Sequence, residues 1–550
     1  CWYIVYFDSE VNIESAAAQF ASVDEVAVVQ LNSRLENIGD AQVSNTAIQP
    51  SAAPATRGKL YPAFNDPDLD KQWHYINIGD TNVFSGVKKG ADINAGEAWD
   101  ITAGDNRIVV AIIDNVVKPT HPDLAANMWV NEAEKNGAEG VDDDGNGYVD
   151  DVYGYNFVEN KGIMSPDDHG THVAGTVSAV NNNGIGVAGV AGGRYPTQGV
   201  RIMAIQILHE GKSGDFERAA QYAAENGAVI AQNSWGYDGE TAKNIYPSDR
   251  RAIDYFIDNA GMNADGVQVG PMKGGLVVFA SGNDSRDFGW PGQYERALAV
   301  ASVGPDGKTA YYSNYGDWVD VSAPGGNQRL GNECGVYSTV VGGRYDYMQG
   351  TSMACPHVTG IAALAVAHSL QLKKKLTVLE LRDILVRSTH NIDQYCTGNK
   401  LSVNGSSLVQ IPLNTFKGKM GVGYIDAFKA LMNVEGIPCV TVRTGNRVTV
   451  DLTDVIGGNP TSMTDKDGYP TISISLPQAD RAKLGIEGDI VISKTGKLQL
   501  KCTKPGSAIA TITFIAGGNA IGSNEATGGM LVTCKVAILS RSFATNGGWL

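Results

Sequence analysis

The sequence Ile108-Val109-Val110-Ala111-Ile112-Ile113-Asp114 is an uninterrupted apolar run that ends in a carboxylate. Further short, mainly apolar runs follow it along the chain, at 202–208, 229–230, 276–279 and 298–301. Such runs lack the alternation of a half-exposed strand. They are typical of strands that are buried on both faces of a parallel sheet.

Helical segments separate these runs. The segment 215–226 (DFERAAQYAAEN) begins with a capping residue, Asp215, and stops at Gly227. Regular alternation of strands and helices predicts an α/β fold with a doubly wound, mostly parallel sheet. In such a sheet the reactive groups gather in loops at the carboxyl ends of the strands.

The composition divides the 550 residues into several regions, and a chain of this length is expected to hold about two to four domains. We predict an N-terminal segment at 1–40, with a helix at 13–20 and a strand at 26–29. A Ser/Ala/Pro-rich linker follows at 41–59, and the α/β domain occupies 60–436. From 437 to 550 apolar and polar residues alternate, which predicts an all-β sandwich domain. Examples of this alternation are Val448, Val450 and Leu452, Ile472 and Ile474, and Leu498 and Leu500.

The charge balance excludes one class of partner. Asp and Glu outnumber Lys and Arg by 59 to 43, which gives a formal net charge of -16. This balance argues against a nucleic-acid partner, because phosphate binding needs a cationic face. It is compatible with a secreted protein that holds divalent cations. No apolar run approaches the ~20 residues that span a bilayer, so we predict no transmembrane segment.

The cysteines and the N-terminus bear on the cellular location. Seven scattered cysteines are neither a disulfide scaffold nor a zinc ribbon. The chain opens on a strand-like run without a signal peptide, which indicates that an upstream segment is missing. Cys1 is a candidate lipid-bearing N-terminus left by signal cleavage, although such anchors usually precede a flexible tether.

Three short segments carry reactive side chains. Asp114 ends a buried strand, where an unpaired carboxylate is costly. The segment 168–175 (DHGTHVAG) places His169 at the start of a helix of small residues. The segment 350–357 (GTSMACPH) leads into an apolar helix at 358–367, with Pro356 near its first turn. Ser352 is therefore expected at the helix entrance, beside free N–H groups.

Each of these residues alone has a simpler interpretation. An Asp at a strand end is more often a cap, a His beside a Gly is usually a satisfied structural residue, and a Ser at a helix start is usually an N-cap. His169 and His172 could instead form a metal pair. Their spacing and the lack of a third ligand nearby argue against it.

Asp114 and the segments 168–175 and 350–357, taken together in this order, are a much more specific signal than any one of them alone. Asp, then His-Gly-Thr-His, then Gly-Thr-Ser-Met-Ala resembles the subtilisin family of serine proteases, over about residues 60–435. Connecting motifs also match the family, namely Asn65-Asp66-Pro67, Gln72-Trp73, His121-Pro122-Asp123-Leu124, Ala280-Ser281-Gly282-Asn283, Ser313-Asn314-Tyr315-Gly316 and Ala323-Pro324-Gly325-Gly326. The rival G-x-S-x-G signature of serine hydrolases fails, because Ala354 stands at its last position.

The resemblance implies four catalytic roles. Ser352 would be the nucleophile, His169 the general base and acid, and Asp114 the group that orients the imidazole. Asn283 would donate its side-chain amide to the developing oxyanion, beside the Ser352 backbone N–H. One departure affects this set. Asn115 and Val116 follow the Asp, where the family usually has Ser or Thr and then Gly, so an amide would replace the supporting hydroxyl and a side chain would crowd the site.

The resemblance also implies substrate-binding residues. Ser234, Trp235 and Gly236 match the family strand that pairs with the substrate backbone by β-augmentation. Gly289 matches the floor of the pocket for the residue before the cleaved bond, so we expect a preference for large apolar residues there. An alternative interpretation is that Trp235 is simply a core residue.

Two loops are candidate calcium sites. Residues 180–187 resemble the calcium loop of the family, with the Asn183 side chain and the carbonyls of Val180, Ile185 and Val187 as ligands, joined by Asp66 and Asp123. Separately, residues 142–151 (DDDGNGYVDD) resemble the first half of an EF-hand loop. Its predicted ligands are Asp142, Asp144, Asn146, the Tyr148 carbonyl and Asp150. The alternative is a solvated acidic turn, although five carboxylates in ten residues repel one another without a cation.

Residues 1–40 resemble the end of the family's inhibitory propeptide, which the protease itself would cut off between about Ala41 and Lys59. The sequence thus predicts a secreted or cell-surface/periplasmic, calcium-stabilised, monomeric serine endopeptidase that acts on peptides and proteins. The alternative, from another class, is a catalytically silent binding module, because fold alone does not decide function.

Overall fold

The computed structural model describes residues 5, 12–23, 26, 28–30, 35–37, 61–81, 83, 85–162, 164–209, 211–237, 244–404, 407–452, 472–493, 496–516 and 530–542. A nine-stranded sheet lies at its centre, in the order β16-β19-β13-β12-β11-β9-β2-β6-β3. All neighbouring strands in it are parallel except β16 and β19. The bounds are β2 Val109–Asp114, β3 Gly154–Asn156, β6 Arg201–Gln206, β9 Ala228–Asn233, β11 Leu276–Ala280, β12 Leu298–Val303, β13 Val321–Pro324, β16 Thr389–His390 and β19 Tyr424–Ile425. Every apolar run quoted above contributes a strand to this sheet, so the predicted α/β fold is confirmed.

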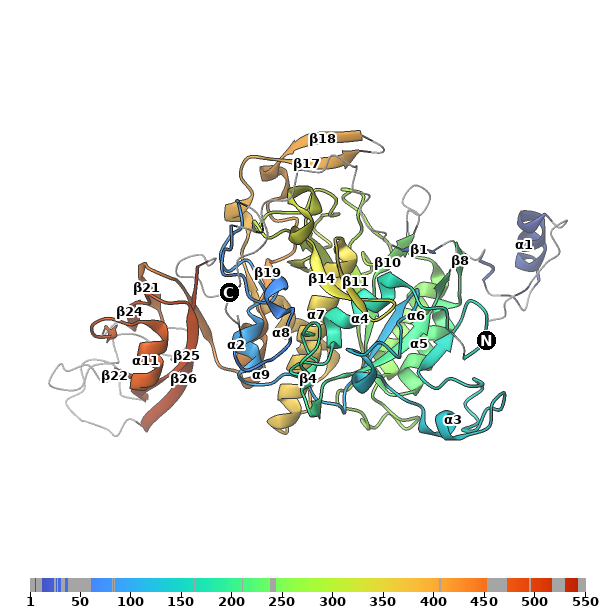
Figure 1. Cartoon of the computed structure of the whole chain (residues 1–550), viewed down its shortest axis with the longest axis horizontal. Helices are drawn as coiled ribbons and strands as arrows, with labels where there is room; N and C mark the ends of the chain where they lie inside the picture. Colours follow the sequence, from blue (N-terminus) through green and yellow to red (C-terminus); the bar gives the residue numbers. More distant parts are fainter. Residues whose placement is uncertain are drawn as a thin grey trace.

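Helices cover both faces of the sheet (Figure 1). Val110 and Ile112 of β2 belong to the core shared with α4, α7 and α9, whereas Val109, Ala111 and Ile113 belong to the core shared with α5 and α6. The bounds are α2 Ala95–Trp99, α3 Glu132–Asn136, α4 Asp168–Ser178, α5 Phe216–Glu225, α6 Pro247–Asn259, α7 Thr351–Gln371, α8 Val378–Arg387 and α9 Ala427–Glu435. In the described part of the chain, α7 alone is long and apolar enough to cross a membrane. However, 94% of its apolar window is buried inside the protein, as in a core helix.

The topology places the reactive residues. After β2 the chain forms β3 and then β6 on one side of it, and then crosses to β9 on the other side of β2. Such a reversal of strand order opens a crevice at the carboxyl ends of the strands. Asp114 is the last residue of β2, and Ser234 follows β9 directly.

Short two-stranded ladders border the sheet. Their bounds are β4 Gly193–Arg194 with β5 Thr197–Gln198, β7 Leu208–His209 with β8 Lys212–Ser213, β14 Val336–Val340 with β15 Arg344–Met348, and β17 Asn399–Asn404 with β18 Ser407–Pro412.

Among its described residues, the N-terminal segment contains one predicted element and one that was not predicted. The helix α1, Ile13–Ala21, matches the prediction. The strand prediction at 26–29 is wrong for Val26, Val28 and Val29, which lie outside any strand. A strand needs a paired edge, and here β1, Leu35–Asn37, takes the edge of β10, Trp235–Tyr237. The predicted linker at 41–59, and the cut within it, lie outside the described residues.

The described residues of the C-terminal part form two further sheets, ordered β20-β26-β25-β22 and β21-β24-β23 and drawn in orange to red in Figure 1. Their alternating side chains, such as Val448, Val450 and Leu500, share a core of their own. A helix, α11 Gln478–Leu484, is an addition to the all-β prediction. The strand bounds are β20 Cys439–Arg443, β21 Arg447–Asp451, β22 Ile472–Ser475, β23 Val491–Ile492, β24 Lys497–Lys501, β25 Gly506–Ala516 and β26 Met530–Arg541. The domain boundaries themselves stay predictions.

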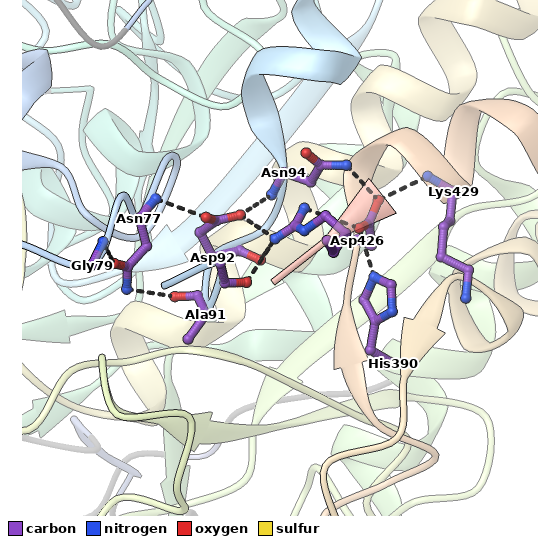
Figure 2. A network of polar contacts seen from close by, with 10 residues as sticks. Asn77, Gly79, Ala91, Asp92, Asn94, His390, Asp426 and Lys429 are labelled. Carbon is purple, nitrogen blue, oxygen red and sulfur yellow. Dashed lines mark hydrogen bonds and ion pairs between the residues drawn. The ribbon is translucent and has the colours of Figure 1, made fainter. Parts of the chain in front are cut away.

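A buried ion network joins these sheets to the α/β part (Figure 2). Arg541, the last residue of β26, donates to Asp92 at 2.5 Å and to Asp426 at 3.3 Å. Asp426 caps α9 through the Lys429 N–H and accepts from His390 Nε2 at 2.7 Å. Burial lowers the pKa of His390 to about 4, so this imidazole is neutral at pH 7.

Candidate active site

Asp114 and His169 form a buried hydrogen-bonded pair. The Nδ1–H of His169 donates to Asp114 Oδ1 across 2.7 Å, and the Asp114 side chain is fully buried. His169 is the second residue of α4, whose N-cap Asp167 accepts from the His169 N–H at 2.9 Å. The end of β2 and the start of α4 therefore hold both groups at one edge of the sheet.

Asn115 supports this pair differently from the prediction. Its backbone N–H, not its side-chain amide, donates to Asp114 Oδ1 at 2.7 Å. The buried Asn115 Oδ1 has no hydrogen-bond partner among the described residues. The Val116 side chain is buried, and the Val116 backbone packs against Gly170, where an added Cβ would lie 2.7 Å from the Val116 carbonyl oxygen.

Ser352 lies at the start of α7, as predicted, and α7 packs against α4. Its side chain is almost fully buried, and its hydroxyl donates to the Ser234 carbonyl at 3.3 Å. α7 begins at Thr351 rather than at 358, so Pro356 lies inside the helix and not in its first turn.

Asn283 follows β11 and contacts the residue before Ser352. Its Oδ1 accepts from the N–H and the hydroxyl of Thr351, both at 2.9 Å. Its Nδ2 lies toward Gly350, where an added Cβ would come within 3.2 Å of it. With the oxygen anchored in this way, the amide nitrogen lies beside the start of α7.

The predicted substrate strand pairs with the protein's own N-terminal segment. β10 is antiparallel to β1, with Glu36 opposite Gly236 and Asn37 opposite Trp235. The Trp235 ring packs on Phe216 and Phe279 at 4.9 and 5.1 Å, so the side chain is a core residue while the backbone serves the strand.

Gly289 lies directly against neighbouring backbone and an aromatic ring. A Cβ there would meet the Ser281 carbonyl oxygen at 2.2 Å and the Trp318 ring at 3.0 Å. Only glycine therefore fits at this position.

The first predicted calcium loop surrounds Asp123. Its Oδ2 accepts from the Val187 N–H at 2.9 Å and its Oδ1 from the Asn183 amide at 2.6 Å. The N–H groups of Asn182 and Asn183 donate to Asp66, and that of Ile185 donates to Asn183 Oδ1. The Val180 N–H donates to the Asp123 carbonyl. Burial, helped by the charge of Asp66, raises the pKa of Asp123 to about 7.

The second loop gathers a different set of carboxylates from the predicted one. Oxygen atoms of Glu134, Asp144 and Asp151 lie within 4.8 Å of one another. Asp150 points elsewhere, since both of its oxygens accept from the Gly140 N–H at 3.0 Å. Asp142 binds the N–H groups of Asn146 and Gly147, and Tyr148 donates its N–H to Asn146.

Comparison with known proteins decides the family. The model of the subtilase family matches residues 105–421, more than half of the chain. This chain belongs to the subtilase family. It is a subtilisin-like serine protease, and hence a hydrolase.

Relatives of this subtilase are similar over most of the α/β region. A thermophilic serine proteinase of Bacillus sp. (strain AK1) is 32% identical over 374 residues, 66% of this chain and 76% of that protein. Thermitase of Thermoactinomyces vulgaris is 32% identical over 277 residues, 50% of this chain and 79% of that protein. An extracellular basic protease of Dichelobacter nodosus is 31% identical over 358 residues, 60% of this chain and 53% of that protein. This chain therefore spans about half of that protein's length. Among solved structures, proteases from Pseudoalteromonas arctica align with a TM-score of 0.47 and 30% identity, covering 68% of this chain and 99% of that one.

Sequence reasoning missed two groups of residues in this subtilase. Glu134 and Asp151 belong to the second acidic cluster, yet Glu134 precedes the Asp-rich motif and Asp151 lies just beyond its predicted closing ligand. Leu35 and Gln30 of the N-terminal segment contact β8 and α6: Ser213 Oγ accepts from the Leu35 N–H at 2.8 Å, and Gln30 exchanges two hydrogen bonds with Ser248. Long-range pairings of this kind leave no local signal.

Proposed function

We propose that this subtilase cleaves peptide bonds with Asp114, His169 and Ser352 as its catalytic triad. The carrying observation is the buried 2.7 Å hydrogen bond from His169 to Asp114, on a helix that packs against the helix bearing Ser352. Because Asp114 accepts the Nδ1 proton, the neutral imidazole has its lone pair on Nε2, as a general base requires.

The proposed reaction proceeds through an acyl-enzyme. Ser352 Oγ forms a bond to the scissile carbonyl carbon while its proton passes to His169 Nε2. The C–N bond then breaks and the leaving amine takes that proton. A water molecule, deprotonated by the same imidazole, releases the acid and restores Ser352. Asn283 Nδ2 and the Ser352 N–H are the proposed donors to the oxyanion, which matches the anchoring of Asn283 Oδ1 by Thr351.

The proposed substrate is an extended peptide that pairs with β10, and residues 1–40 act as an intramolecular inhibitor. In support, β1 lies along β10 and Leu35 is only 5% exposed in the core that contains Trp235. Ser213 and Ser248 hold the same segment. A segment bound in this register excludes a substrate from the same strand edge. Gly289 remains the proposed floor of a pocket for a large apolar residue.

Calcium is the proposed stabilising ion at both loops. Asp66, Asp123, Asn183 and the carbonyls of Val180, Ile185 and Val187 would hold one ion, and Glu134, Asp144 and Asp151 the other. These donors fit, because all are oxygens. The oxygens of Glu134, Asp144 and Asp151 lie within 4.8 Å of one another, and in the other loop the charge of Asp66 acts on Asp123. Burial raises the pKa of Asp151 to about 6, a penalty on the anion that a bound cation would offset.

We further propose a secreted or cell-surface/periplasmic, monomeric enzyme. Support comes from the name of the extracellular basic protease among its relatives. Cys1, the candidate lipid anchor, lies outside the described residues.

A fluorophosphonate probe tests the proposed mechanism. It should label the processed protein at one serine and should not label Ser352→Ala. The variant Ser322→Ala is the matched control. Ser322 lies in β13, away from the site, and its fully buried hydroxyl donates to the Met420 carbonyl. Absence of labelling in processed wild type would contradict the proposal.

A further inference from the structure

Pro356, the sixth residue of α7, removes a helix hydrogen bond at the proposed nucleophile. In a regular α-helix the N–H of residue 356 would bond to the carbonyl of residue 352. Proline has no N–H, so the Ser352 carbonyl does not receive its usual helix donor.

The Ser234 side chain supplies a donor to that carbonyl. Its hydroxyl lies 2.9 Å from the Ser352 oxygen, although 118 positions separate the two residues. Ser234 is fully buried, in the turn between β9 and the substrate strand β10. The hydroxyl of Ser352 donates to the Ser234 carbonyl in return.

Gln232, the penultimate residue of β9, orients the Ser234 hydroxyl. Its Nε2 donates to Ser234 Oγ at 2.7 Å, so the hydroxyl proton is left for the Ser352 carbonyl. Its Oε1 accepts from Thr359 Oγ1 at 2.6 Å and from Cys355 Sγ at 3.1 Å, both on α7. These side chains are all fully buried. The two donors on α7 thus fix which amide atom faces Ser234.

We propose that Gln232 and Ser234 are positioning residues, which replace the bond lost to Pro356 and so fix the backbone of Ser352. The inference rests on the proposed role of Ser352 as nucleophile. This role of the Ser234 hydroxyl is separate from the proposed pairing of the β10 backbone with substrate. A misplaced nucleophile slows the chemical step more than it weakens substrate binding.

Steady-state kinetics of Ser234→Ala test the proposal. We expect kcat to fall by about tenfold or more with KM within about twofold of wild type, because the backbone that binds substrate is retained. The control Ser322→Ala removes an equally buried hydroxyl and should keep kcat within about twofold. The double variant Ser234→Ala/Pro356→Ala regains a helix N–H for the Ser352 carbonyl, so its kcat should rise above that of Ser234→Ala.

The outcomes separate this inference from the proposed function. If wild type is not labelled by the fluorophosphonate probe, the proposed nucleophile is wrong and the inference falls with it. If wild type is labelled but Ser234→Ala retains the wild-type kcat, only the inference is overturned. A kcat loss that Pro356→Ala does not relieve also overturns it, because a general packing defect would behave in that way.

Discussion

Asp114 shows at the scale of one residue how a departure from a family pattern is accommodated. The sequence predicts support from the Asn115 amide, whereas the structure uses the Asn115 backbone N–H. A backbone donor is available whatever side chain follows the Asp. The Val116 side chain is buried, and the Val116 backbone lies against Gly170 of the facing helix. The change at 115–116 therefore leaves the bond from His169 to Asp114 intact.

Asp249 carries a pH-dependent penalty on stability. This residue of α6 is 6% exposed and accepts from Tyr237 and Ser248, and burial raises its pKa to about 6. The folded protein keeps the Asp249 proton up to about pH 6, whereas the unfolded chain loses it near pH 4. Stability therefore falls as the pH rises from about 4 to 6, and the full penalty is present above pH 6.

We predict that Asp249→Asn stabilises the protein above pH 6 by at most about 3 kcal/mol and gives no gain below about pH 4. Urea unfolding between pH 3.5 and 8, in the Ser352→Ala background to prevent self-digestion, measures the difference. Asp383→Asn, an exposed carboxylate on α8, is the control, with an expected change below about 0.5 kcal/mol. A gain that does not vary with pH would contradict the assignment.

Elements that depend on local sequence were predictable, and pairings between distant segments were not. The apolar runs give the strands of the central sheet, and Asp215 caps α5 as expected, accepting from the Arg218 N–H. Pro356 misled the prediction of where α7 begins, because a buried side-chain donor compensates the proline inside the helix. The pairing of β1 with β10 joins residues about 200 positions apart, and no pattern within either strand specifies its partner.

The β1 strand gives a prediction about inhibition. A synthetic peptide of residues 26–40 should inhibit the processed enzyme, and Leu35→Asp should weaken inhibition by about 10–100-fold, since a buried leucine contributes about 1.5–3 kcal/mol. Val28→Asp is the control because Val28 is 43% exposed. Initial rates against a chromogenic peptide give the inhibition constants. Equal effects of the two substitutions would argue against burial of Leu35 in the core that contains Trp235.

The loop between α3 and β3 gives a prediction about calcium. A chelator should lower the Tm of wild type, because an ion at 100 times its Kd contributes about 2.7 kcal/mol. Glu134→Gln and Asp151→Asn should each reduce the calcium-dependent gain in Tm. Asp150→Asn is the matched control, since its carboxylate faces Gly140 and lies outside the cluster. If Asp150→Asn has the larger effect, the EF-hand-like ligand set predicted from sequence is the right one.

At the scale of the whole molecule, the C-terminal sheets are joined to the α/β part by a buried charge. The Arg541 side chain is 6% exposed, and its guanidinium contacts Asp92, Asp426 and the Gly90 carbonyl. Although burial acts to raise it, the pKa of Asp426 lies below its usual value because His390 and Arg541 stabilise the anion. Loss of the guanidinium would leave two buried carboxylates without their cation.

We predict that Arg541→Met destabilises the protein by about 3–5 kcal/mol, the usual cost of breaking a buried ion pair. Lys483→Met is the control at the same boundary. Lys483 is 41% exposed and pairs with Glu97 at 3.0 Å, so its loss should cost less than about 1 kcal/mol. Urea unfolding of both variants in the Ser352→Ala background measures the difference. Equal losses would mean that the buried network contributes no more than a surface pair.

The position of Arg541 near the end of the sequence affects co-translational folding. Asp92 and Arg541 are 449 positions apart, so at about 5–20 residues per second the carboxylate leaves the ribosome roughly 20–90 s before its counter-ion. During that interval the nascent protease domain cannot form the ion pair between Asp92 and Arg541. The buried ion network is therefore completed only after β26 has been synthesised.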